Sequence, residues 1–223
     1  MNTVNGVLTR NLRAEAEKRG YIVIAPAAPD DELFFEEGAR IFPEFLKMIL
    51  ADYKIQDGKF HIAGPSNGGI ASFHVAAANP QYFLSVTAFP GYMWDPTPAK
   101  LQAISKMCVF MYVGENDPYM WHSEMKKEAE FLRSKGTVAN YTVEKGQPHR
   151  LDTLAGPNAS RLFEGFEQTK KGCSKSKAWG DRPIVKRPRS GVPQRFGAKR
   201  EPDRAKHQAT VGLTLKINLT SVN

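Results

Sequence analysis

The stretch that decides the fold is FHIAGPSNGGIA, which covers Phe60–Ala71. A short apolar strand enters a Gly-x-Ser-x-Gly turn centred on Ser66, and a helix of small residues, expected over Ile70–Ala78, leaves it. So tight a corner strains the central residue and lifts its side chain clear of the sheet, and glycines are needed where the chain passes too close for a Cβ. The pattern predicts that Ser66 is a nucleophile. The alternative is a serine that only caps the helix.

The rest of residues 1–171 alternates between helices and strands. Strands are expected at Tyr21–Ala25, Phe60–Ala63, Leu84–Phe89, Met107–Val113 and Val138–Val143, and helices at Gly6–Arg19, Glu36–Tyr53, Ile70–Ala78, Trp121–Lys135 and Pro157–Lys171. Apolar strands separated by helices indicate an α/β fold, in which a mostly parallel sheet carries helices on both faces. Reacting groups in such folds gather at the carboxyl ends of the strands.

Two polar side chains follow later strands of this predicted sheet. Asp117 lies on a loop that opens with Gly114, and His149 lies on the loop after the last strand. A serine hydroxyl needs a neighbouring base and the base needs an orienting anion, so Ser66, Asp117 and His149 are the candidate catalytic residues. Asp117 could instead cap a helix, and Glu115 is then a weaker substitute for the same catalytic role; His149 could be a solvated loop side chain. The other histidines are expected to pack or to lie at the surface: His61, His74 and His122.

The order of these motifs resembles that of the α/β-hydrolase superfamily across residues 6–168. Its single-domain serine esterases are the most similar, either of the feruloyl-esterase or depolymerase type or of the dienelactone-hydrolase type. The resemblance implies that Ser66 is the nucleophile, His149 the general base and then acid, and Asp117 the residue that orients His149. It also implies hydrolysis of carboxylic esters through an acyl-enzyme intermediate, without a cofactor. One oxyanion donor would be the backbone N–H of Asn67.

The chain departs from this superfamily on the N-terminal side of the serine turn. Phe60–Ala63 corresponds to the fifth strand of the superfamily, and Tyr21–Ala25 corresponds to the fourth. Gly6–Arg19 is then the first helix, so nothing is left for strands one to three. The loop that supplies the second oxyanion donor is reduced to Asn2–Asn5 at most. The expectation is an N-terminally truncated α/β-hydrolase domain, and the alternative function is an inactive or weakly active hydrolase-like fragment.

The strand order of the superfamily places the missing third strand between the fourth and the fifth. Its loss leaves a slot in the sheet, because paired strands lie about 4.8 Å apart and unpaired buried backbone groups are costly. The fourth strand could shift across, another segment could fill the slot, or the chain could be a fragment that folds poorly. Val211–Leu219 has the alternation of a strand and is the candidate filler.

Basic residues are concentrated in the C-terminal part of the chain. The net charge of +8 divides into +11 over residues 169–223 and −3 over the remainder. Residues 172–223 are predicted to form a basic, low-complexity and largely disordered tail, because they contain too little apolar surface to bury. Residues 170–206 could bind nucleic acid in a salt-sensitive way. Only Trp179 and Phe196 could stack on bases, so no nucleic-acid partner is expected.

A small-molecule ester is the expected partner of the domain. Aromatic residues that follow two strand ends could line its pocket or simply pack over the sheet edge: Tyr92, Trp94, Tyr119 and Trp121. Cys108 and Cys173 lack the spacing of metal ligands, so no metal or cofactor is expected. No apolar stretch approaches the roughly 20 residues of a membrane helix, and Met1–Arg13 does not resemble a secretory signal. These observations predict a cytoplasmic chain with Cys108 packed as a reduced thiol.

Overall fold

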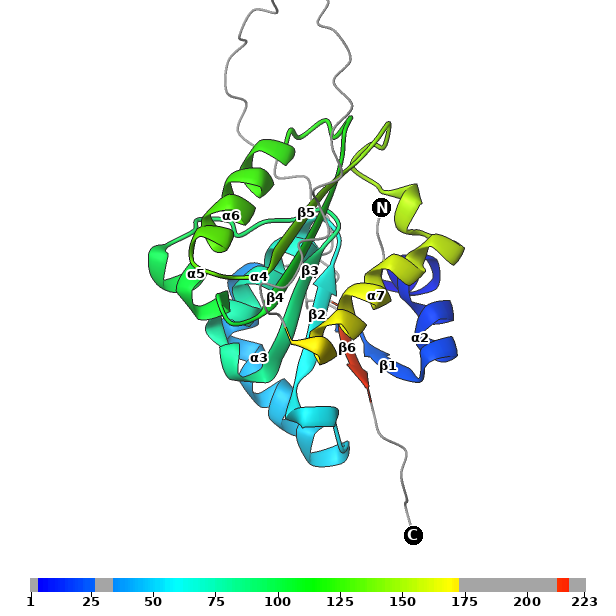
Figure 1. The fold of residues 1–223 in the computed structure, drawn as a ribbon. Coiled ribbons are helices and arrows are strands. Elements are labelled where there is room, and N and C mark those ends of the chain that lie inside the picture. Colours follow the sequence, from blue (N-terminus) through cyan, green and yellow to red (C-terminus); the bar gives the residue numbers. More distant parts are fainter. Residues whose placement is uncertain (1–3, 27–33, 173–211, 217–223) are drawn as a thin grey trace, which may run out of the picture.

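The computed structural model describes residues 4–26, 34–172 and 212–216. In these ranges one sheet has the strand order β1-β6-β2-β3-β4-β5 (Figure 1). Its strands are β1 (Tyr21–Ile24), β2 (Phe60–Gly64), β3 (Phe83–Ala88), β4 (Cys108–Gly114), β5 (Ala139–Glu144) and β6 (Gly212–Lys216). Strands β2 to β5 pair in parallel, whereas β6 is antiparallel to both of its neighbours. The prediction of a mostly parallel sheet is confirmed.

Helices cover both faces of this sheet (Figure 1). One face carries α3 (Phe34–Asp52), α4 (Asn67–Ala78), α5 (Pro98–Ile104) and α6 (His122–Ser134), and the other carries α1 (Val4–Val7), the π-helical turn η1 (Leu8–Leu12), α2 (Arg13–Arg19) and α7 (Ser160–Gln168). Short 3₁₀ turns lie at η3 (Gln56–Gly58), η4 (Pro80–Tyr82), η5 (Asp152–Leu154), η6 (Gly156–Ala159) and η7 (Thr169–Lys171). The α/β architecture expected from the alternating pattern is therefore present.

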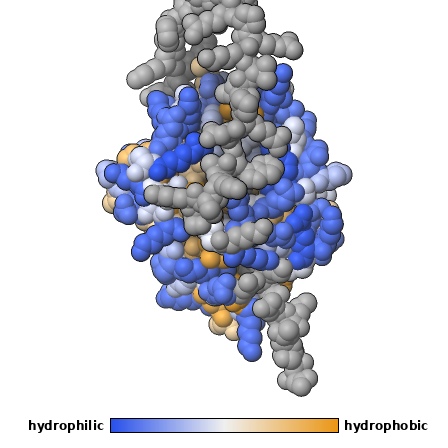
Figure 2. All heavy atoms as spheres, viewed as in Figure 1, coloured by the Kyte–Doolittle hydropathy of each residue, from blue (hydrophilic) through white to orange (hydrophobic). Residues whose placement is uncertain are grey.

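Each face of the sheet has its own apolar core. The first contains Phe42, Ile62, Val109 and Met125 among others, and joins α3, α4, α5 and α6 to the strands. The second contains Tyr21, Phe110, Phe163 and Leu12 among others, and joins η1 and α7 to the strands. The face seen in Figure 2 is mostly hydrophilic wherever its atoms are not grey, with small hydrophobic patches. Burial of these two clusters is the main force that holds the helices on the sheet.

The expected elements are found with small shifts at their ends, and one helix was not expected. The predicted first helix is divided, because η1 interrupts it before it ends at Gly20, whose left-handed φ of 68° suits a glycine C-cap. The unexpected helix is α5. Its N-terminus carries two recognisable signals, since Thr97 Oγ1 accepts a hydrogen bond from the Lys100 N–H (3.2 Å) and Pro98 occupies the first helical turn.

The predicted slot in the sheet is filled by β6, which confirms Val211–Leu219 as the source of the filler. Thr214 pairs with Val23 of β1 on one side and with His61 of β2 on the other. A segment distant in sequence therefore gives β1 and β2 a partner between them. Gly212–Lys216 belongs to the part 172–223 that the sequence assigns to a basic tail. The remaining tail residues, 173–211 and 217–223, lie outside the described residues.

The expectations for the Cys108 thiol, for membrane spans, and for location and nucleic-acid binding have different outcomes. Cys108 is fully buried in the second core and is disulfide-bonded, so the prediction of a reduced packed thiol is wrong. Its partner cysteine lies outside the described residues. No helix within the described ranges combines the length and apolar character of a membrane span. The cytoplasmic location and the absence of a nucleic-acid partner stay predictions, since residues 170–206 fall almost wholly outside those ranges.

Candidate active site

Ser66 lies at the corner between β2 and α4 with a strained backbone. Its φ of 55° and ψ of −125° are costly for a residue with a Cβ. Its N–H donates to the carbonyl oxygen of Pro90 (2.7 Å), and its own carbonyl accepts from the N–H groups of Gly69 and Ile70. A Cβ on Gly69 would overlap the backbone of Pro90 and Gly91, so this glycine lets the corner approach the loop after β3.

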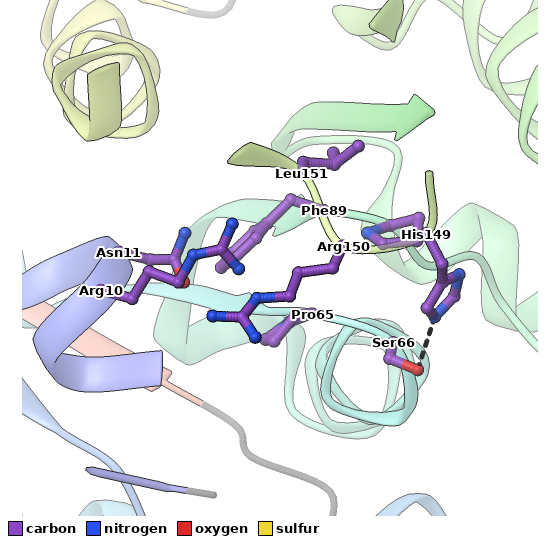
Figure 3. Close-up of a pocket in the computed structure, with 9 residues that line it drawn as sticks. Arg10, Asn11, Pro65, Ser66, Phe89, His149, Arg150 and Leu151 are labelled. Carbon is purple, nitrogen blue, oxygen red and sulfur yellow. Dashed lines mark hydrogen bonds between the residues drawn. The ribbon is translucent and has the colours of Figure 1, made fainter. Parts of the chain in front are cut away.

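The hydroxyl of Ser66 faces His149 and does not cap the helix. Nε2 of His149 lies 2.9 Å from Ser66 Oγ (Figure 3), whereas α4 receives no side-chain capping bond from Ser66. The alternative of a helix-capping serine is therefore excluded. The same imidazole reaches a second partner, because its Nδ1 lies 2.8 Å from Oδ2 of Asp117. The structure thus joins Ser66, His149 and Asp117 in one hydrogen-bonded line.

Asp117 is held inside the protein by its own loop. Its side chain is completely buried, and its Oδ1 accepts a hydrogen bond from the Tyr119 N–H (2.9 Å). Helix α6 begins five residues later at His122, so Asp117 does not act as its N-cap. Glu115 is used differently, since its Oε2 accepts from the Gly146 N–H (2.8 Å). The loops after β4 and β5 are therefore tied together beside the imidazole.

A close approach of these two loops positions His149. The Asn116 N–H donates to the Gln147 carbonyl oxygen (2.9 Å). A Cβ on Gly114 would overlap the carbonyl oxygens of Gln147 and Pro148, so only glycine allows this contact. The Gly114 of the sequence motif thus allows the histidine loop to pack against the end of β4.

The four predicted aromatic residues form one connected cluster beside His149. The rings of Tyr119 and Trp121 meet the imidazole edge-on, at centroid distances of 4.7 and 4.9 Å. Tyr92 lies 5.3 Å from Trp121, and Trp94 lies 6.2 Å from Tyr92. Tyr119 and Trp94 are 52% and 40% exposed, so part of the cluster is open to solvent. The rings border the imidazole, and whether a ligand binds them stays a prediction.

The other histidines lie elsewhere, as expected. His61 on β2 is buried, its Nδ1 lies 2.8 Å from Ser85 Oγ, and its ring stacks on Phe166 at 4.8 Å. Desolvation, together with the charge of Lys170, lowers the pKa of His61 to about 3, so it remains neutral. The described residues contain no group of three or more His, Cys, Asp or Glu side chains that could hold a metal ion.

A buried carboxyl group near the site was missed by the sequence reasoning. Glu128 on α6 accepts a hydrogen bond from the Met93 N–H at Oε2 (2.8 Å), which anchors the loop that follows β3. Its Oε1 has no partner among the described residues. Desolvation raises the pKa of Glu128 to about 8. The available signal is its spacing, because Glu128 follows Met125 by three residues and precedes Leu132 by four on the apolar face of the helix.

A small pocket, partly open to solvent, adjoins Ser66, and its basic residues were also missed. Arg10 and Asn11 enter it from η1, and Arg150 follows His149 directly (Figure 3). Asn11 Nδ2 donates to the Leu154 carbonyl oxygen (2.7 Å), which ties η1 to the segment after His149. Helical spacing in the sequence could not place Arg10 here, because the π-helical turn shifts its register.

The sequence is similar to a known protein family, and the fold is similar to that of a solved hydrolase. The sequence matches the model of the family described as "Esterase: Putative esterase" over residues 40–165, which include Ser66, Asp117 and His149. The comparison with curated proteins found no match. Among solved structures, a predicted CIB-like hydrolase from Thermoplasma acidophilum, determined at 1.45 Å resolution, is 14% identical with a TM-score of 0.42. The likeness covers 61% of this chain and 60% of that chain, so this protein spans less than two thirds of that hydrolase.

The family match and the fold point to the same conclusion. A mostly parallel sheet with helices on both faces and a serine corner at a strand end has the character of an α/β hydrolase. The finer distinction between the feruloyl-esterase, depolymerase and dienelactone-hydrolase types stays a prediction. Since the family match extends over more than half of the 223 residues, the chain belongs to this esterase family.

Proposed function

We propose that this protein hydrolyses carboxylic esters, with Ser66 as nucleophile, His149 as general base and acid, and Asp117 as the residue that orients the imidazole. The proposal rests on one observation, the hydrogen-bonded line from Ser66 Oγ through both imidazole nitrogens to Asp117 Oδ2, with separations of 2.9 and 2.8 Å. These separations lie within hydrogen-bond reach for proton transfer.

The proposed reaction begins with the neutral imidazole. Nδ1–H of His149 donates to Asp117, which leaves Nε2 free to accept the hydroxyl proton of Ser66. Ser66 Oγ then attacks the ester carbonyl carbon, and His149 passes its proton to the leaving alcohol oxygen as the C–O bond breaks. Water hydrolyses the resulting acyl-enzyme by the same route, with His149 again taking and returning a proton.

Stabilisation of the oxyanion is assigned to the start of α4. Asn67 is the first residue of that helix and follows Ser66 directly, so its backbone N–H is the proposed donor. The positive end of the helix dipole favours negative charge at the same place. One oxyanion donor is typically worth about 3 kcal/mol of transition-state stabilisation. The aromatic cluster beside His149 is the proposed surface for the leaving alcohol.

A fluorophosphonate probe tests the nucleophile directly. We expect the full-length chain to be labelled, Ser66→Ala to be unlabelled, and hydrolysis of 4-nitrophenyl acetate to be lost with the label. Ser123→Ala is the matched control, because Ser123 is an exposed serine on α6 that should leave labelling unchanged. Equal labelling of wild type and Ser66→Ala would disprove the proposal. A folded wild type without label or turnover would favour the inactive hydrolase-like alternative.

A further inference from the structure

The loop after β3 contacts the serine corner through two backbone hydrogen bonds. The Ser66 N–H donates to the carbonyl oxygen of Pro90 in this loop (2.7 Å). The Phe89 N–H, at the start of the loop, donates to the carbonyl oxygen of Gly64 (3.1 Å). Because these bonds hold the strained corner on the loop, the position of Ser66 Oγ depends on where the loop lies.

The same loop also supports the imidazole, through two aromatic rings. Tyr92 packs edge-on against Trp121, with the ring centroids 5.3 Å apart. Trp121 in turn meets the His149 ring edge-on, at a centroid distance of 4.9 Å. A shift of the loop would therefore disturb the support of both partners in the 2.9 Å contact between Ser66 Oγ and His149 Nε2.

Glu128 anchors this loop from helix α6. Its side chain is buried, and its Oε2 accepts a hydrogen bond from the N–H of Met93 (2.8 Å), whose own side chain is fully buried. Met93 follows Tyr92 directly, so the bond fixes the loop next to the ring that contacts Trp121. Helix α6 packs on β4 and β5, and the anchor is thus attached to the sheet rather than to another loop.

A carboxyl group is a costly choice for this position. Oε1 of Glu128 has no hydrogen-bond partner among the described residues. The neighbouring buried positions on the same face of α6, Met125 and Leu132, are apolar. Burial of a polar group with an unpaired atom lowers stability, whereas an apolar side chain would not carry this cost. The carboxyl group contributes an acceptor that holds the loop in one place.

We propose that Glu128 is a positioning residue for the reaction, which holds the loop after β3 and thereby keeps Ser66 Oγ at hydrogen-bond distance from His149 Nε2. This inference rests on the proposed function. Glu128 is buried and acts through the loop, so the substrate does not contact it. Loss of the anchor should therefore lower kcat and leave KM almost unchanged, since a misplacement of about 1 Å can cost about 100-fold in rate.

Replacements of Glu128 that differ in their acceptor test the proposal. Glu128→Met removes the acceptor at similar length, and we expect kcat for 4-nitrophenyl acetate to fall about 10- to 100-fold. Glu128→Asp is one methylene shorter, withdraws the acceptor from the Met93 N–H and should also lower kcat. Burial raises the pKa of Glu128 to about 8, so the carboxyl is protonated at neutral pH and the amide of Glu128→Gln is a close mimic. Glu128→Gln should therefore keep kcat close to wild type.

Leu132→Ala is the control for lost stability. Leu132 is fully buried on the same face of α6, one turn beyond Glu128. Its truncation should lower the thermal unfolding midpoint at least as far as Glu128→Met does, yet leave kcat close to wild type at temperatures well below both midpoints. Equal losses of kcat in Glu128→Gln and Glu128→Met, or in Leu132→Ala and Glu128→Met, would overturn the inference. If Glu128→Met does not fold, Glu128→Asp is judged by the same comparisons.

Amide hydrogen exchange measured by NMR provides a readout that does not depend on turnover. The N–H groups of Met93 and Ser66 should exchange faster in Glu128→Met than in wild type, by a larger factor than the amides of β4. If the wild type does not hydrolyse 4-nitrophenyl acetate, the proposed function fails, and this measurement alone decides whether Glu128 holds the serine corner. Unchanged exchange at Ser66 in a folded Glu128→Met or Glu128→Asp variant would show that it does not.

Discussion

The role of Asp117 can be isolated most cleanly, because its buried carboxylate lies 2.8 Å from His149 Nδ1 and accepts a hydrogen bond from the Tyr119 N–H of its own loop. We predict that Asp117→Asn lowers kcat by about 10⁴-fold with little change in the fold, since an amide in this place favours the wrong imidazole tautomer. The measurement is kcat for 4-nitrophenyl acetate beside the thermal unfolding midpoint. Glu115→Gln keeps an acceptor for the Gly146 N–H and should retain activity close to wild type.

A fall in activity of similar size for both variants would contradict this assignment. It would mean that the two carboxylates act together on the loops rather than through the imidazole. The unfolding midpoints separate these cases, because only a loop effect is expected to lower the midpoint of Glu115→Gln.

Glu128 is predicted to make stability depend on pH. Its pKa is raised from 4.5 to about 8 by burial, so the folded chain holds a proton between these pH values and the unfolded chain does not. The unfolding free energy of the wild type therefore falls as pH rises through this window, by at most about 1.4 kcal/mol per pH unit from this group. Glu128→Gln lacks the titration, so its unfolding free energy relative to wild type should increase from pH 5 to pH 8.

Urea unfolding across this pH range measures the effect. Glu124→Gln is the control, since Glu124 is an exposed carboxylate on the same helix and should leave the pH dependence of the wild type in place. A constant difference between Glu128→Gln and wild type at every pH would show that the carboxyl is not protonated in the folded chain.

Among the individual residues, those with a local signature were predictable and those defined by distant contacts were not. The glycines around Ser66 predict its role, and the positions of Asp117 and His149 after strand ends predict theirs. Arg10 becomes part of the pocket only because a π-helical turn redirects it and because the segment after β5 returns to meet it. Glu128 looks like a surface carboxylate until the loop after β3 covers it. Such placement depends on tertiary packing, which no local pattern contains.

Strand β6 connects β1 to the rest of the sheet. Thr214 pairs on both sides, with Val23 and His61, so its backbone lies in the middle of two ladders. We predict that Thr214→Pro destabilises the chain by about 2–3 kcal/mol, because proline removes a donor and does not fit a central strand. In this variant, the amide hydrogens of β1 and β2 should exchange faster than in the wild type. The exchange rates in β4 and β5 should change less.

Thr214→Val is the matched control, because it keeps the backbone N–H that proline removes and should therefore destabilise the chain less. If both substitutions destabilise the chain equally, or if exchange in β1 and β2 is unchanged, the pairing of β6 between these strands is incorrect.

The helices and strands could largely be predicted from the spacing of apolar residues and from the turn residues between them. The strands were recognisable as apolar runs, and the slot followed from counting strands back from Ser66. The alternation of Val211–Leu219 predicts a strand that could fill the slot. Alternation alone could not exclude a shift of β1 toward β2, or a fragment that folds poorly. The choice is made by hydrogen bonding, since β6 gives partners to backbone groups of β1 and β2 that would otherwise be unpaired.

For the whole molecule, we predict that removing residues 212–223 costs about 5 kcal/mol of the 5–15 kcal/mol typical of a domain. The deletion takes away β6 and so separates β1, with α2 and η1, from the rest of the sheet. Circular dichroism and urea unfolding of residues 1–211 measure the loss. A synthetic peptide of residues 209–220 added in excess should restore part of it. Wild-type stability of residues 1–211 would contradict the prediction.

The place of β6 also has a consequence for biosynthesis. Gly64 ends β2 and Gly212 begins β6, so the ribosome adds nearly 150 residues between two strands that must pair. At about 5–20 residues per second this takes on the order of ten seconds, during which β1 and β2 have emerged without the strand that separates them. Two unpaired strand edges in a nascent chain can pair with other chains. The yield of folded protein in a cell should therefore depend more on chaperones that bind the nascent chain during this interval than on the stability of the folded protein.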